Sequence, residues 1–195
     1  MSPRLELIQL QRPTSFGAAT ECFRYTGVTG IIAAGIGAGS VLMGASLGSG
    51  SSHAWLERVS VTITVITAFA VPVTAGRMLK ICNLDQLPST GGGALVGNKI
   101  SKAVGSAGPS PGSIIVANTT PLSGATAGGA IAFIPLSGVG AAGSVLEYEL
   151  TFGSKCANML IPEDLGIASV NAFDAGGTFE MKFEVDYEVE STSGF

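Results

Sequence analysis

The chain has 195 residues, a net charge of −4 and 12% charged residues, whereas soluble domains average about 25%. This length allows one substantial hydrophobic core, and the low charge disfavours a solitary, highly soluble monomer. The Lys and Arg residues are scattered along the chain, so no basic patch is available to neutralise phosphates and no nucleic-acid partner is expected.

The cysteines and the N-terminal residues bear on the compartment of synthesis. Cys22, Cys82 and Cys156 lie far apart, which fits neither a disulfide framework nor a zinc site and predicts buried or free thiols. The opening residues MSPRLELIQLQRP lack the unbroken apolar stretch of a signal peptide, because Glu6 and Gln9 interrupt it. We therefore expect synthesis in a reducing cytoplasm, without secretion by that route.

Residues 1–20 are expected to form an N-terminal arm or edge strand, with LELIQL as a short candidate strand. Residues 21–195 are expected to form a single domain that begins with the candidate strand FRYTGV at 23–28. Apolar side chains of the arm are candidates for contacts between copies of the chain, and these are Leu5, Leu7, Leu10 and Phe16.

The stretch GVTGIIAAGIGAGSVLMGASLGSGSS (27–52) is uncharged and permits three interpretations. It is long enough to span a bilayer, and Gly35 and Gly39 have GxxxG spacing, but each glycine weakens a helix by about 1 kcal/mol and no aromatic belt flanks it. GIGAGS partly matches a dinucleotide-binding loop, yet Ser40 replaces the third glycine and no βαβ pattern follows. Two strands, GIIAA and SVLMGAS, joined by a Gly-rich turn are favoured, so no membrane contact is expected.

The next stretch has the most specific strand pattern in the chain. From Val59 to Val65, β-branched apolar residues alternate with Ser and Thr, which predicts a strand with one buried face. The alternation shifts at Ile66, where a bulge or bend is expected. Trp55 is predicted to anchor the start of this strand or a subunit contact, and the nearby His53 is expected in a solvated loop.

Segment 83–112 is rich in Gly, Ser and Pro, and a long loop is expected there, with a short helical turn near 94–104. On either side of this segment the sequence predicts short strands separated by turns. The strands are RMLKIC (77–82), SIIVAN (113–118), GAIAFIPL (129–136), SVLEYELTF (144–152), ANMLI (157–161) and IASVN (167–171), with PEDLG (162–166) as a turn.

The chain closes on its longest alternation, TFEMKFEVDYEVE at 178–190. From Phe179 every odd position is apolar and every even one polar, so one face is expected in the core and the other in water. The acidic face is expected to discourage edge-to-edge aggregation. The many short strands, with no long amphipathic helix, predict an all-β antiparallel sandwich or jelly roll with long Gly-rich loops.

The sequence lacks patterns for catalysis or metal binding. The single histidine, His53, has no GxSxG motif for Ser–His chemistry and no acid or thiol beside it for a metal. Glu147 and Glu149 share the outer face of a predicted strand, and Glu163 and Asp164 follow a proline in a predicted turn. No enzyme activity, metal or cofactor is therefore expected.

Four segments occur in a characteristic order: GAGSVLMGASLG (37–48), RVSVTITVITAFAVPVTAGRMLKI (58–81), Glu163–Ile167, and Ala175–Thr178 before the closing strand. Together they resemble structural proteins of tailed-bacteriophage virions. In that family a β-sandwich subunit ends in such a hairpin and assembles, often as a trimer, on a capsid or tail. The resemblance extends from about residue 35 to 190 and implies a capsid decoration, or cement, protein.

We therefore expect a virion structural protein, made in the host cytoplasm, that forms a homo-oligomer with a trimer favoured. Its expected partners are the major capsid protein or other virion proteins, with 1–20 and 83–112 extending the contacts. A tail or baseplate component is the alternative within this class. A lectin-like module that binds a receptor or glycan, and a membrane-active protein that uses 27–52, are the alternatives outside it.

Overall fold

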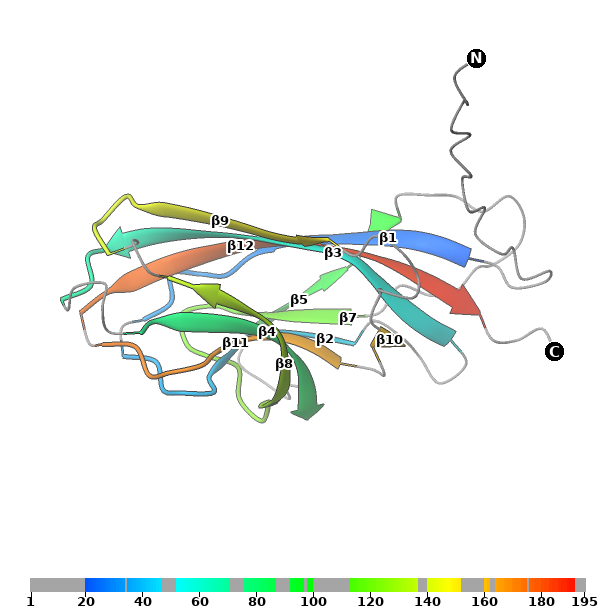
Figure 1. Cartoon of the computed structure of the whole chain (residues 1–195), viewed down its shortest axis with the longest axis horizontal. Helices are drawn as coiled ribbons and strands as arrows, with labels where there is room; N and C mark the ends of the chain where they lie inside the picture. The colour runs from blue at the N-terminus through cyan, green and yellow to red at the C-terminus, as the bar shows by residue number, and fades with distance from the viewer. Residues whose placement is uncertain are drawn as a thin grey trace, which may run out of the picture.

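The computed structural model describes residues 20–33, 35–46, 52–70, 76–86, 92–96, 98–99, 113–136, 140–151, 160–161, 164–174 and 176–191. Within these ranges the chain forms two antiparallel β-sheets that pack face to face, and it forms no helix (Figure 1). The predicted all-β antiparallel sandwich is confirmed.

Sheet A is built around β12, which lies between β3 and β1. The opposite edge of β3 pairs with β9 and β10, and the opposite edge of β1 pairs with β6. The strands of sheet A are β1 (Thr20–Val28), β3 (Ser52–Thr67), β6 (Asn98–Lys99), β9 (Val145–Thr151), β10 (Leu160–Ile161) and β12 (Thr178–Ser191).

Sheet B has the strand order β5-β7-β2-β11-β4-β8. The chain crosses between the two sheets repeatedly, from β1 to β2, back to β3, and again to β4, so that strands distant in sequence become neighbours. The strands of sheet B are β2 (Val41–Ser46), β4 (Met78–Gln86), β5 (Gly92–Val96), β7 (Ser113–Ala117), β8 (Thr126–Pro135) and β11 (Asp164–Ser169).

The core lies between the sheets and follows the alternation of β12. Its six apolar residues, from Phe179 to Val189, are at most 3% exposed, as the period-two pattern predicts. Tyr187 stacks against two rings of the neighbouring β1, with centroids 5.5 Å from Phe23 and 5.7 Å from Tyr25. Residues of β3 on the same side of the sheet are also buried, and these are Leu56, Val59, Val61, Ile63 and Val65.

Two bulges interrupt the pairing of β3 with β12. Ile66 is the extra residue between Val65 and Thr67, so the bulge predicted at Ile66 is confirmed. The second bulge falls at Glu57, where the sequence places two polar residues, Glu57 and Arg58, in succession. The bulge at Glu57 keeps both Leu56 and Val59 on the core side, whereas the bulged Ile66 is itself 42% exposed.

Several predicted boundaries are wrong in sheet B and its connections. GIIAA forms no strand over the described residues 30–33, where Ile32 makes a single bridge to Phe179. The segment 83–112 contains the end of β4 and the strands β5 and β6, so it is not one long loop. Residues 94–96 belong to β5 and not to a helical turn. Pairing through the backbone lets these Gly-rich segments form strands without an alternating pattern.

Two further local predictions are corrected near the ends of strands. β11 begins at Asp164, so Asp164, Leu165 and Gly166 are strand residues and not part of a turn. His53 lies within β3, opposite Glu190 in the register, and not in a loop before it. In both places, pairing with a neighbouring strand extends the β-strand beyond the residues whose sequence pattern predicts one.

Candidate interaction surfaces

The outer face of sheet A carries a cluster of ion pairs that joins four strands. Asp186 of β12 accepts hydrogen bonds from Arg24 of β1, at 2.6 and 2.8 Å, and from Arg58 of β3, at 3.0 Å. Glu184 pairs with both arginines, and Glu149 of β9 accepts a bond from Arg58 at 3.1 Å. The strand registers place Arg24, Asp186 and Arg58 side by side, so the cluster follows from the pairing of the strands.

This ion-pair cluster corrects the interpretation of the acidic closing strand. Because β12 is paired on both sides in the middle of sheet A, its charges protect no sheet edge. Asp186 and Glu184 pair with arginines of neighbouring strands, and Glu188, which was expected to face water, is only 3% exposed. Opposite charges on directly paired residues of neighbouring strands stabilise a sheet, so the ion-pair cluster strengthens sheet A.

The arginines hold Asp186 in its charged form. Burial alone would raise the pKa of Asp186, but hydrogen bonds from Arg24 and Arg58 outweigh burial and lower this pKa below its ordinary value. The bonds to Asp186 raise the pKa of both arginines. Since the folded-state pKa of Asp186 is depressed, its contribution is complete above the unfolded pKa of about 3.9 and is lost as the pH falls through the folded pKa.

Asp186→Asn is expected to lower the free energy of unfolding by about 2 kcal/mol at neutral pH, because hydrogen bonds to charged groups are replaced by weaker ones. The difference from the wild type should shrink below about pH 4, where the wild-type carboxylate also becomes neutral. Urea unfolding of both proteins across the acid range measures this difference. A difference that is independent of pH would contradict the assigned role.

Two shallow hollows lie on the outer face of sheet A, and both are lined by Ser60 and Thr62. Their volumes are about 370 and about 300 Å³. The short side chains of Ser60 and Thr62 lie between longer charged ones of β9 and β12, which leaves the space open. The hydroxyl, carboxylate and ammonium groups suit a small polar ligand. The larger hollow is completed by Thr26, Gly27, Val28, Lys182, Phe183 and Glu184, and the smaller by Glu147, Tyr148 and Glu149.

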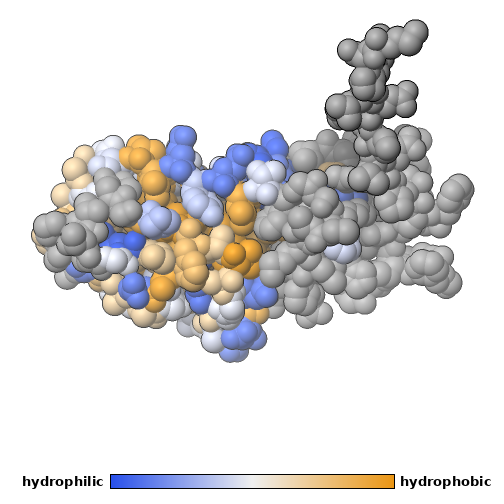
Figure 2. All heavy atoms as spheres, in the orientation of Figure 1, coloured by the Kyte–Doolittle hydropathy of each residue, from blue (hydrophilic) through white to orange (hydrophobic). Residues whose placement is uncertain are grey.

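Exposed apolar side chains lie on β8 and β9, which are edge strands of sheet B and sheet A respectively. Within the described part of the chain, β8 pairs only with β4 and β9 only with β3. Phe133 of β8 is 53% exposed and Val145 of β9 is 57% exposed. Figure 2 shows apolar side chains across the middle of the side on which these two strands lie. Neither residue is among the contact residues predicted from the sequence.

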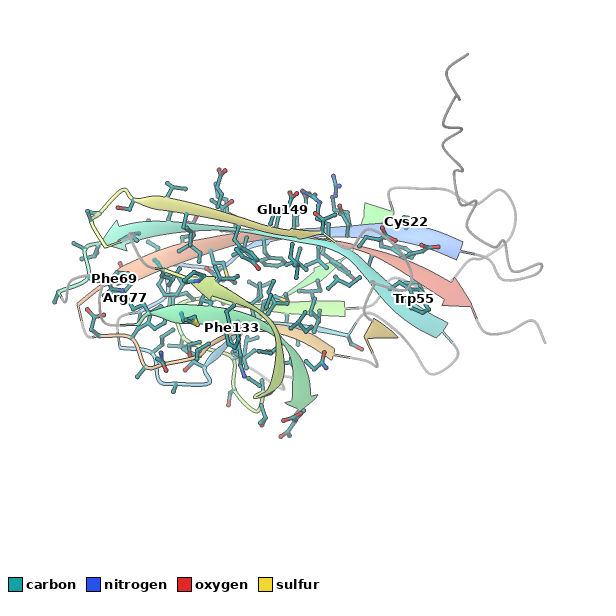
Figure 3. The ribbon with its side chains drawn as sticks, in the orientation of Figure 1. Cys22, Trp55, Phe69, Arg77, Phe133 and Glu149 are labelled. Atoms are coloured by element: carbon teal, nitrogen blue, oxygen red, sulfur yellow. The ribbon has the colours of Figure 1, made fainter. Side chains whose placement is uncertain are left out.

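One end of the sandwich is closed by aromatic rings next to a buried cation (Figure 3). Phe69, Phe173 and Phe179 have ring centroids 5.7 to 6.5 Å apart. The Arg77 guanidinium lies 4.3 Å from the centre of the Phe69 ring and donates to Asp174 at 2.7 Å. This contact fastens the segment before β4 to the segment before β12.

Glycines in the two motifs of the phage resemblance have packing roles. A Cβ at Gly177 would collide with the Phe69 ring, and a Cβ at Gly166 would collide with the Leu84 side chain. Gly176 has φ of +113°, in a region that side chains rarely adopt. These motifs are therefore explained by close packing within one subunit.

Two of the three cysteines lie among the described residues, and both are thiols, as predicted. Cys82 is a buried free thiol in β4, and burial raises the pKa of this thiol to about 11. Cys22 is half-buried on β1. Cys156 lies outside the described residues.

The structure describes only one of the predicted contact residues, and its part in a subunit contact stays a prediction. Trp55 is half-buried in β3, where its register partners are Glu188 of β12 and Leu160 of β10, so it lies within the strand and not at its start. It lines neither hollow. The other predicted contact residues lie outside the described residues, and these are Leu5, Leu7, Leu10 and Phe16.

No group of three or more His, Cys, Asp or Glu side chains that could hold a metal is found among the described residues. The same residues include no helix that is long and apolar enough to cross a membrane. No family model matches the chain, and no curated protein or solved structure shows significant similarity to it. The resemblance to tailed-bacteriophage proteins therefore stays a prediction.

Proposed function

We propose that the chain is a structural subunit of a bacteriophage virion that assembles with copies of itself and decorates or stabilises the capsid. A trimer is the favoured assembly, and the major capsid protein is the expected partner. The protein is made in the host cytoplasm and has no catalytic role. A tail or baseplate position is the alternative within this class.

The observation that carries the proposal is the order of the strands. β9-β3-β12-β1 in sheet A lies against β8-β4-β11-β2 in sheet B, and the chain crosses repeatedly between these two sets, with β4 and β8 following each other in sheet B. Eight strands in two Greek keys are the arrangement expected of a jelly roll, which is common in viral capsid domains and also in lectins. The low charge of the chain and the exposed Phe133 add support, because subunit contacts are depleted in charge and enriched in aromatic residues.

Light scattering and co-sedimentation test this function together. We expect the purified chain to have the mass of an oligomer and to sediment with empty capsids of the phage that encodes it. A specific interface that buries about 1,200–2,000 Å² of total surface is enough for the chain to bind a capsid in this way. A stable monomer that stays in the supernatant at all capsid concentrations would contradict the proposal.

The two hollows on sheet A favour glycan binding as a second candidate function. Their hydroxyl, carboxylate and ammonium groups are the types that bind sugar hydroxyls. Ser60→Phe would fill space that both hollows share, whereas Trp55→Ala would leave both intact. Loss of capture by a glycan array in Ser60→Phe, with capture retained in Trp55→Ala, would support this candidate, and no capture of the wild type would contradict it.

A further inference from the structure

Two of the edge strands, β8 of sheet B and β9 of sheet A, are protected from association to different degrees. β9 exposes Glu147 and Glu149, and Glu149 pairs with Arg58. β8, TAGGAIAFIP, has no charged residue over its ten residues. Its exposed residues include Ala130, Phe133 and Pro135. Charges, proline, short length and bulges usually protect exposed sheet edges. β8 pairs irregularly before Ala132 and ends on Pro135, but it carries no charge, so its stretch from Ala132 to Ile134 is less protected than β9.

The charge pattern identifies the partner that β8 can accept. A contact about a two-fold axis places the same strand of two copies side by side, so a charge near the axis meets its own copy. On β9 such a contact would bring Glu147 and Glu149 against the glutamates of a second copy. On β8 it would bring only uncharged residues together.

The residues around Phe133 make a regular and apolar contact region. From Ala132 to Pro135, β8 pairs with β4 without interruption, whereas all three register shifts lie in its earlier part. Lys80 lies opposite Phe133 in the register, but its ammonium group donates to the carbonyl of Gly128 at 2.7 Å. An exposed aromatic ring in such a region is the type of residue that dominates protein contacts.

We propose that two copies of the chain associate through antiparallel pairing of their β8 strands, with Phe133 packed against the second copy. Sheet B then continues across both subunits. This inference rests on the proposed self-assembly and adds the surface and its symmetry. Because a two-fold contact joins copies in pairs, the favoured trimer, held together by another surface, would associate with a second trimer through β8, and the complete assembly would be a hexamer.

Phe133→Glu tests the contact, with Val145→Glu as the matched control. Both positions are exposed residues on edge strands, so both variants should fold with wild-type circular dichroism and thermal melting. Like charges facing each other across a contact cost several kcal/mol, so Phe133→Glu should raise the dissociation constant of the pair at least about 100-fold. Light scattering should then show half the wild-type mass for Phe133→Glu, and the wild-type mass for Val145→Glu.

A second variant and the capsid assay separate the remaining outcomes. Ala130→Lys, also on exposed β8, should give the same halved mass if Phe133→Glu folds poorly. A wild-type protein that is monomeric or has an odd number of subunits would overturn the β8 contact, whatever its capsid binding. An unchanged mass in both β8 variants would also overturn it, and if capsid binding alone were lost, β8 would contact the capsid instead. If the wild-type protein has an even number of subunits but does not bind capsids, the result contradicts the proposed function and leaves the β8 contact standing.

Discussion

Asp174→Ala is expected to lower the free energy of unfolding by about 3 kcal/mol, because it leaves the charge of Arg77 buried without this carboxylate. The side chain of Arg77 is 2% exposed and that of Asp174 is 14% exposed, so water can replace the lost contact only in part. Chemical denaturation measured by tryptophan fluorescence or circular dichroism gives the loss directly.

Two comparisons show whether burial causes this loss. The double variant Arg77→Met with Asp174→Ala should be more stable than Asp174→Ala alone, because an apolar chain of similar length can still pack on Phe69. Glu149→Ala removes a contact of Arg58 at a carboxylate that is 56% exposed, and it should cost less than about 1 kcal/mol. Equal losses for Asp174→Ala and Glu149→Ala would contradict the buried-pair account.

Gly177→Ala should lower the free energy of unfolding by about 2 kcal/mol, because the added methyl group would collide with the ring of Phe69. This ring is held by Phe173 and Phe179 and lies under Arg77, so it cannot move without disturbing the whole end of the sandwich. Thermal melting of the variant measures the effect.

Gly129→Ala is the matched control for Gly177→Ala. Gly129 is exposed on β8, and a Cβ there would meet no atom within 4 Å. Alanine at this position should be neutral or slightly stabilising, since glycine restricts the unfolded chain least. If both alanine variants were equally stable, the close contact between Gly177 and Phe69 would not be a determinant of the fold.

The strands that were predicted most accurately from the sequence are those with one buried face and one solvent-exposed face. β3, β9 and β12 alternate clearly, and even the bulge at Ile66 was visible as a shift in that alternation. β2 and β11 are buried along most of their length, so they show no period of two, and the start of β11 was mistaken for a turn. β5 lies in a Gly-rich segment whose composition is that of a loop.

The functional surfaces were harder to predict, because they depend on strand register. Arg24, Arg58 and Asp186 come from three distant parts of the chain and become neighbours only when β1, β12 and β3 pair. Phe133 became a candidate only when β8 was known to be an edge strand with this residue on the exposed side. The signal in the sequence was the absence of charge in TAGGAIAFIP, which also suits a buried strand.

The measurement that tests the proposed function most directly is the location of the chain on purified phage particles. Immunogold electron microscopy, together with quantitative mass spectrometry of the same particles, gives both position and copy number. We expect many copies per particle, with the label distributed over the capsid. Particles that contain no copies, with all of the chain in the soluble fraction of the lysate, would contradict the proposed role as a virion structural protein.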